Sequence, residues 1–193
     1  MAQNRERRDL LRDTAIDVLA EGGAHRLTHR NVDRAAELPV GTAKNYFPTR
    51  DALLLAAAER VYQRYLADQD QLTVAMPTNR DDLVAVLAEL IRRGTGTDRP
   101  RLVALLELHA EAMRRPELSR LLARQTEIDF AMYERLHRAA GLPGTAARSR
   151  VLARTMQSTL LSLLTHPEDA LAAQGLDDLD GFVRGVVDTV YPP

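Results

Sequence analysis

Residues 27–54, LTHRNVDRAAELPVGTAKNYFPTRDALL, carry the pattern that decides the fold. They predict two short helices joined by a tight turn, followed by the first turn of a longer helix. Thr28 is a suitable N-cap for the first helix, because its hydroxyl can accept a hydrogen bond from an otherwise unpaired backbone N–H. Leu27 and Val32 are spaced as a hydrophobic staple around that cap, and Ala36 continues the apolar stripe at helical spacing.

The second helix of this stretch is predicted from Val40 to Tyr46. Leu38-Pro39 ends the first helix, because the residue before a proline is disfavoured in the α region. Ala43 and Phe47 then form the inner face of the second helix, and Thr49 caps the helix that follows. Its outward-facing residues are Val40, Gly41, Thr42, Lys44, Asn45 and Tyr46. Two short helices on a tight turn, the second with a polar outer face, are the signature of a helix-turn-helix.

The rest of the chain keeps the helical period, and no alternating strand pattern competes with it. A preceding helix, about Arg5 to Glu21, stops at Gly22-Gly23. Its arginine-rich start can reach a phosphate or be merely solvated, and the sequence leaves both interpretations open. We expect an all-α fold of about nine helices, with a three-helix DNA-binding domain over residues 1–48 and a helical domain over residues 49–193. The later predicted helices span about 49–70, 79–91, 101–114, 116–140, 146–165 and 177–190.

Composition limits the classes of function. The 193 residues suit one compact unit or two small domains, and 45% hydrophobic residues are ample for a core. The absence of cysteine excludes disulfides and thiolate metal sites. No apolar run approaches the roughly 20 residues of a membrane span, and no leader pattern is present, so a cytoplasmic location is expected. Residues 1–50 hold nine basic and seven acidic residues, so the case for DNA depends on where the charges lie.

The first quarter of the chain resembles the DNA-binding domain of the TetR family of bacterial transcriptional regulators. Three positions depart from the family pattern: Glu37 stands where a turn glycine is usual, Pro39 where a capping serine is usual, and Lys44 where a tyrosine is usual. The residues that carry the resemblance are Leu27-Thr28, Ala36, Gly41-Thr42 and residues 46–53, with Leu11, Ala15, Leu19 and Gly22 of the preceding helix.

The resemblance implies that residues 40–46 enter the major groove of a DNA operator. Thr42 and Asn45 can contact base edges, and an asparagine amide matches the donor and acceptor of adenine. Gly41 lets the backbone come close to the bases, and Arg30 matches a position that reads a base. Phosphate contacts, which fix the register on DNA, are expected from Thr28 and His29 at a helix N-terminus and from Lys44, Tyr46 and Arg50.

The resemblance also implies a homodimer and a small-molecule effector. Two reading helices about 34–36 Å apart would match successive major grooves of a palindromic operator. The expected dimer residues are Leu152, Leu160, Leu163, Leu164, Phe182, Val186 and Val190 of the last two helices. A mainly apolar effector would bind among Tyr62, Tyr65, His109, Met113, Gln125, Met132, Tyr133 and Met156. Several of these residues are equally suited to an ordinary core.

Two other classes of protein compete with a ligand-responsive repressor. An enzyme is disfavoured: His109-Ala110-Glu111 resembles part of a zinc deaminase motif, but there is no cysteine to complete it. Glu107 and Glu111 form an i, i+4 pair, which we interpret as a solvated charged face. No cofactor or metal is expected. The remaining alternative is an all-helical small-molecule-binding or interaction protein without operator-specific DNA binding, which leaves the polar outer face of residues 40–46 without a purpose.

Overall fold

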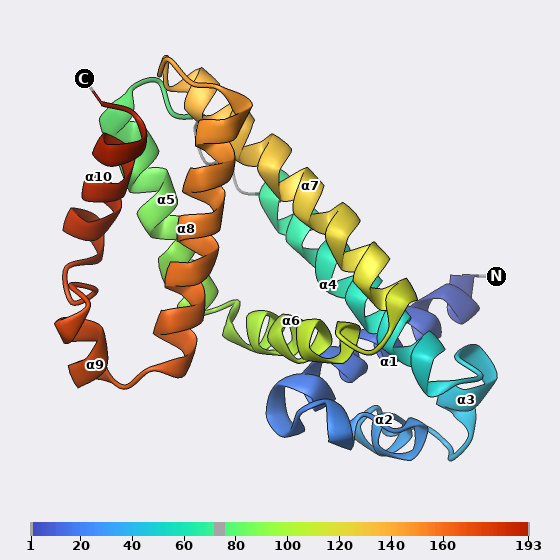
Figure 1. Ribbon diagram of the computed structural model, residues 1–193. Helices are drawn as coiled ribbons and strands as arrows, with labels where there is room; N and C mark the ends of the chain where they lie inside the picture. Colours follow the sequence, from blue (N-terminus) through green and yellow to red (C-terminus); the bar gives the residue numbers. More distant parts are fainter. Residues whose placement is uncertain (1, 72–75, 193) are drawn as a thin grey trace. The chain divides into compact units, whose positions relative to one another are not determined.

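The computed structural model describes residues 2–71 and 76–192, and Figure 1 shows its helices coloured along the chain. Within these ranges the chain forms ten α-helices and one short 3₁₀ helix, with no strand. The predicted all-α class is therefore confirmed. The sequence pattern does not predict the short helix α9 (Glu168–Ala173). None of the helices in the described ranges is both long enough and apolar enough to cross a bilayer.

The chain packs as two compact units, each built from two segments. The first unit takes in the described residues up to 71 together with residues 100–125, and the second takes in residues 76–99 and 126–192. The helix-turn-helix segment is thus part of a larger packed unit. The division at residues 48 and 49 stays a prediction about function.

The first unit is organised around two long helices. α1 (Ala2–Gly22) packs along α4 (Arg50–Gln71), and α2 (His29–Ala35) packs against both α1 and α3 (Thr42–Tyr46). The short 3₁₀ helix η1 (Ala24–Arg26), most of α6 (Arg99–Ala112) and the start of α7 (Pro116–Ala139) complete it. One apolar cluster runs through these elements and includes Leu11, Leu19, Leu27, Val32, Phe47, Leu54 and Leu108.

The second unit has three helices at its centre. α5 (Arg80–Thr95), α8 (Ala146–Thr165) and α10 (Leu179–Val190) pack on one another, as Figure 1 shows. Side-chain caps set their starts: Asn79 accepts a 2.9 Å hydrogen bond from the Asp82 backbone N–H, Thr145 accepts one of 3.4 Å from Arg148, and Asp178 accepts one of 3.0 Å from Gly181. The fully buried core residues include Leu83, Leu87, Leu152, Met156, Val183 and Val187.

His137 on α7 is a buried titratable group of the second unit. It is 3% exposed, and its ring centroid lies 5.5 Å from that of Tyr191. Burial lowers the pKa of His137 below its ordinary value, and the Tyr133 backbone and Glu134 offset part of this effect. Since the folded state has the lower pKa, it binds fewer protons than the unfolded chain. The stability that neutral His137 contributes is therefore full above the unfolded pKa of 6.5 and is lost as pH falls through the folded pKa.

We therefore expect the melting temperature to fall between about pH 7.5 and pH 5, measured by differential scanning fluorimetry. His137→Gln should flatten this dependence, because the titrating group is gone. His166→Gln is the control, because His166 is exposed and should leave the wild-type dependence intact. If His137→Gln kept the wild-type dependence of melting temperature on pH, His137 would not be the group that causes it.

Candidate nucleic-acid interface

α2 begins where the sequence predicts it. The Thr28 side chain accepts a 3.2 Å hydrogen bond from the backbone N–H of Asn31, which makes it the N-cap. Leu27 and Val32, the predicted staple, are both fully buried. Asn31 adds a second restraint, since its side-chain amide donates to the Arg26 carbonyl at 2.7 Å. The start of α2 is therefore fixed by local chemistry that the sequence already contains.

The turn between α2 and α3 contains two residues with positive φ. Glu37, at the position where a glycine is usual, has φ 54°, a left-handed conformation that costs a non-glycine residue about 1 kcal/mol. Gly41 has φ 96° and is the N-cap residue of α3. α3 consequently begins at Thr42, and the predicted start of this helix at Val40 is wrong. Thr42 closes the turn by donating its hydroxyl to the Pro39 carbonyl at 2.6 Å.

Asp33 anchors α3 to α2. Its carboxylate is fully buried and accepts hydrogen bonds from the backbone N–H groups of Gly41 at 2.7 Å and Ala43 at 2.6 Å. These donors lie at the helix N-terminus, where a negative charge is favoured. Pro39 brings no capping side chain of its own, and Asp33 does the capping from the preceding helix. The sequence pattern misses this residue; the missing serine at position 39 is the one signal that another cap is needed.

The outer surface of the α3 region presents three side chains prominently. Val40 is 83% exposed, and Lys44 and Asn45 are also exposed. Gly41, Thr42 and Tyr46 are half-buried. The inner face is closed, with Ala43 at 0% and Phe47 at 2% exposure. The predicted inner face is thus confirmed, and three of the six residues predicted to face outward are exposed.

The predicted contact residues on α2 differ in how free their side chains are. Arg30 is exposed, and the carboxylate of nearby Asp33 is committed to α3. His29 is half-buried, and its Nε2 donates to the Phe47 carbonyl at 2.6 Å, so its ring ties α2 to the end of α3. The Arg30 side chain therefore remains available to a partner. The His29 ring is engaged, so only the backbone N–H of His29, at the start of α2, can still contact a phosphate.

Arg50 at the start of α4 is held within the protein. Its guanidinium donates to the Ala24 carbonyl at 2.7 Å and to Glu111 of α6 at 3.2 Å. Glu107 of α6 accepts a 2.8 Å hydrogen bond from the Ala24 backbone N–H. These contacts tie Arg50 to its own unit, so its contact with a phosphate stays a prediction. They also correct the interpretation of Glu107 and Glu111, because the pair is not a solvated face. Together they connect α6 to the start of α4 and to η1.

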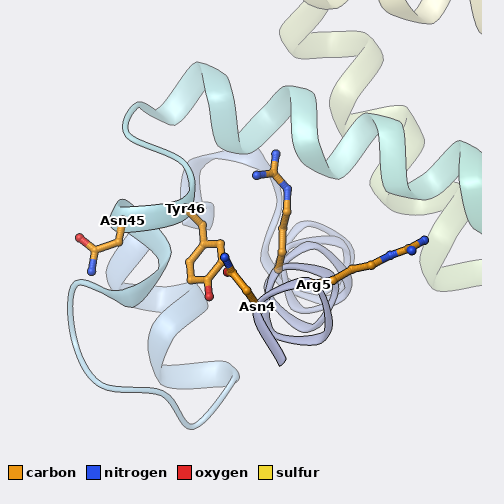
Figure 2. A pocket seen from close by; sticks show the side chains of 5 residues that line it. Asn4, Arg5, Asn45 and Tyr46 are labelled. Atoms are coloured by element: carbon orange, nitrogen blue, oxygen red, sulfur yellow. The ribbon is translucent and has the colours of Figure 1, made fainter. Parts of the chain in front are cut away.

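A hollow of about 600 Å³ opens beside α3. Its lining residues are Asn4, Arg5 and Arg8 from α1 and Asn45 and Tyr46 from α3. Figure 2 shows the Asn4 side chain directed toward the Tyr46 ring, while Arg5 and Asn45 extend away on opposite sides. The sequence pattern identifies the two α3 residues as candidates but not the three from α1.

The predicted effector residues are divided between the two units. Met113 is 77% exposed and His109 is exposed, and side chains this accessible do not line an enclosed cavity. Gln125 is 9% exposed and donates to the Ala58 carbonyl at 3.1 Å, so its amide already serves the first unit. An effector role stays a prediction for Tyr62 and Tyr65 in the first unit and for Met132, Tyr133 and Met156 in the second.

The predicted dimer residues lie on α8 and α10 of the second unit. Leu152 is fully buried in its own unit, so it has no surface to offer to a second chain. α8 also presents two large apolar side chains to solvent, Val151 at 56% and Leu161 at 45% exposure. The other predicted interface residues are all half-buried: Leu160, Leu163, Leu164, Phe182, Val186 and Val190.

Comparison with known proteins links the chain to transcriptional regulators. The family model "Tetracyclin repressor-like, C-terminal domain" matches residues 78–189, more than half of the chain. The transcriptional repressor KstR of Mycolicibacterium smegmatis is 32% identical over 88 residues, which are 46% of this chain and 43% of KstR. The chain therefore spans less than half the length of the curated relatives that it matches.

Solved structures match over nearly the whole chain. A TetR-family member of Streptomyces coelicolor A3 (SCO1917) is 26% identical with a TM-score of 0.68, covering 97% of this chain and 99% of that one. The multidrug-binding protein EbrR, in complex with ethidium, is 25% identical with a TM-score of 0.72 and the same coverage.

Proposed function

The chain belongs to the TetR family of transcriptional regulators, and we propose that it is a ligand-responsive repressor that binds a palindromic operator as a homodimer. The observation that carries this proposal is the outer face of α3. An exposed lysine and an exposed asparagine stand on this short helix, an exposed valine lies just before it, and buried contacts fix the inner face and the N-terminus of the helix. KstR, a named repressor, supports repression over activation.

Base reading is assigned to three side chains. Asn45 is exposed and can pair with both the donor and the acceptor of an adenine edge. The Thr42 hydroxyl already donates its proton to Pro39, so it can only accept, which suits the amino groups of adenine or cytosine. Arg30, exposed on α2, can donate to guanine. Lys44 and Tyr46 are assigned to phosphates, together with the backbone at Thr28 and His29.

Val40 supplies an apolar contact. Its side chain is 83% exposed, and the backbone on both sides is fixed, because Pro39 accepts from Thr42 and Gly41 donates to Asp33. An exposed apolar group at the start of a reading helix suits the C5-methyl group of thymine. We expect that replacing one thymine per half-site by deoxyuridine weakens wild-type binding by about threefold to tenfold.

Val40→Ala should bind the thymine operator and the deoxyuridine operator almost equally, because the side chain that contacts the thymine methyl group has been removed. Electrophoretic mobility shift with each thymine replaced in turn makes the measurement. Lys44→Ala, with Val40 intact, should keep the wild-type discrimination. Equal binding of wild type to every substituted operator would contradict this role of Val40.

A homodimer is proposed because the surface of α3 that would contact bases is small. One short helix gives too few contacts for a specific operator, and two copies about 34–36 Å apart match successive major grooves. We assign the interface to the partly exposed apolar residues of α8 and α10, with Val151 and Leu161 as additions to the predicted set. Their exposure in one chain is the kind of apolar surface that a second copy covers.

The effector is proposed to be a small, mainly apolar molecule. EbrR, at 25–27% identity, has been solved with ethidium and with imidazole, and aromatic ligands of this class are the first to test here. The hydrogen bonds that Glu107 and Glu111 accept from Ala24 and Arg50 offer a route for release, because a displaced α6 would move these two residues on either side of the helix-turn-helix. A ligand that favours the displaced conformer would lower the population able to bind DNA.

The direct test uses duplexes from the DNA upstream of the chain's own gene. The purified protein should shift one of them at nanomolar concentration and should fail to shift a scrambled duplex of the same composition. Ligands that raise the melting temperature of the free protein should weaken operator binding by the same factor by which DNA weakens their own binding. A stabilising ligand with no effect on operator affinity would contradict the regulatory part of the proposal.

A further inference from the structure

We propose that the hollow formed by Asn4, Arg5, Arg8, Asn45 and Tyr46 holds a backbone phosphate of the operator, so that α1 shares in DNA binding with α3. This inference rests on the proposed function, because it concerns the same DNA. It adds α1 residues that the helix-turn-helix motif does not include.

The first turns of α1 carry polar side chains on a face that is otherwise core. Asn4 and Arg8 precede Leu11 and Ala15 by seven residues, which is two helical turns and places each pair on one side of the helix. Leu11 and Ala15 are fully buried, whereas Asn4 and Arg8 are exposed. α1 therefore extends past the core. On the same face of the helix, beside α3, the side chains are the amide of Asn4 and the guanidinium of Arg8. Burial of apolar surface does not explain these exposed polar residues, and an anionic partner does.

Arg8 is held ready for such a partner. Its guanidinium carbon lies 5.1 Å from the centroid of the Phe47 ring, a cation–π contact. A stacked guanidinium keeps its N–H donors free at the edge, and less rotamer entropy is lost when they bind phosphate. Phe47 itself is 2% exposed and closes the inner face of α3, so the position of Arg8 is tied to the reading helix.

The other lining groups are matched to a phosphate. Asn4 brings an amide N–H₂ and Tyr46 a hydroxyl, and Figure 2 shows the Asn4 side chain directed toward the Tyr46 ring. Arg5 adds a second positive charge, and the five lining residues include no carboxylate. Asn45 belongs both to this hollow and to the exposed face of α3. A phosphate here would therefore lie next to the bases that Asn45 reads, and would fix the register of α3 in the groove.

The first test compares two charge changes at neighbouring positions. Asn4→Asp puts a carboxylate into the hollow with almost no change in size, and Gln3→Glu adds the same charge at an exposed residue that does not line it. Both acids lie in the first turn of α1, where they favour the helix, so neither should lower stability. We expect Asn4→Asp to weaken operator binding at least about tenfold more than Gln3→Glu at about 0.1 M salt.

The second test identifies the phosphate. Methylphosphonate linkages, which carry no charge, are placed one at a time along the operator. One position per half-site should weaken wild-type binding and should abolish the difference between Asn4→Asp and Gln3→Glu. Arg8→Gln should reduce the slope of log affinity against log salt by about 0.9 per protomer, and Arg7→Gln, outside the hollow, by clearly less.

The outcomes separate this inference from the proposed function. If the wild type binds a specific operator but Asn4→Asp and Gln3→Glu behave alike, the hollow holds no phosphate and the function stands. If no position of methylphosphonate removes the Asn4→Asp effect, the inference also fails. If the wild type binds no duplex specifically, both the phosphate site and the proposed function are refuted.

Discussion

Replacing Asp33 with alanine is expected to abolish operator binding and to lower the free energy of unfolding by about 2–4 kcal/mol. The fully buried carboxylate accepts hydrogen bonds from the backbone N–H groups of Gly41 and Ala43. Without it, the start of α3 has two unpaired donors and loses its attachment to α2. Chemical denaturation measures the stability, and fluorescence anisotropy with labelled operator measures the binding.

Two variants make the Asp33 result specific. Glu37→Gln removes one negative charge from the same turn at an exposed residue and should change neither measurement by more than a few tenths of a kcal/mol. Asp33→Asn keeps one acceptor oxygen, so its loss of stability should lie between those of wild type and alanine. If Asp33→Ala kept wild-type stability and operator affinity, the buried anchor would have no role in holding α3.

The double change Lys44→Ala with Asn45→Ala is expected to cost about a hundredfold or more in operator affinity without loss of stability. A lost asparagine–adenine pair is worth about 1–3 kcal/mol, and the dimer loses it twice. The lost lysine should also lower the salt slope by about one per protomer. Both side chains are exposed, so their removal leaves the core intact.

Binding measured on operator and on random duplexes of the same length distinguishes the loss of the Asn45 base contact from the loss of the Lys44 phosphate contact. Binding to random DNA should fall much less, because it never included the base contact. Arg135→Ala with Gln174→Ala removes a cation and an amide from exposed positions in the second unit, and should bind the operator as the wild type does. Retention of operator binding in the Lys44 and Asn45 variant would refute the assignment of α3 as the reading helix.

Features of the fold that depend on neighbours in the sequence can be predicted from it. Thr28 caps α2, Leu27 and Val32 are buried beside that cap, and Ala43 and Phe47 close the inner face of α3. Each follows from helical spacing and from the side-chain chemistry of adjacent residues. The all-α class follows in the same way, from apolar stripes repeated along the chain.

Features that depend on packing across the chain could not be predicted. Asp33 bonds residues eight and ten positions away, and only the placement of α3 brings them within reach. Arg50 meets Glu111 across 61 positions, so a cation that local sequence offers to DNA is committed inside the unit. The start of α3 is late because Gly41 has φ 96°, a backbone conformation that residue type permits but does not require.

The helix with six residues, α9, escapes prediction for a different reason: it buries no residue and so carries no apolar stripe. Met113 shows the converse problem. It continues an apolar pattern along α6 yet lies just past the end of that helix and is 77% exposed. Periodicity identifies the apolar face of a helix. Only the structure shows at which residue neighbouring elements cease to bury that face.

Selection of bound duplexes from a random DNA library, followed by sequencing, tests the central claim most directly. Two copies of α3 held by a symmetric dimer should enrich an inverted repeat whose half-site centres lie about 10 base pairs apart, or a multiple of one helical turn. The Lys44 and Asn45 double variant should enrich no such repeat. A wild-type pool without a shared motif, or with a motif that lacks two-fold symmetry, would contradict the account.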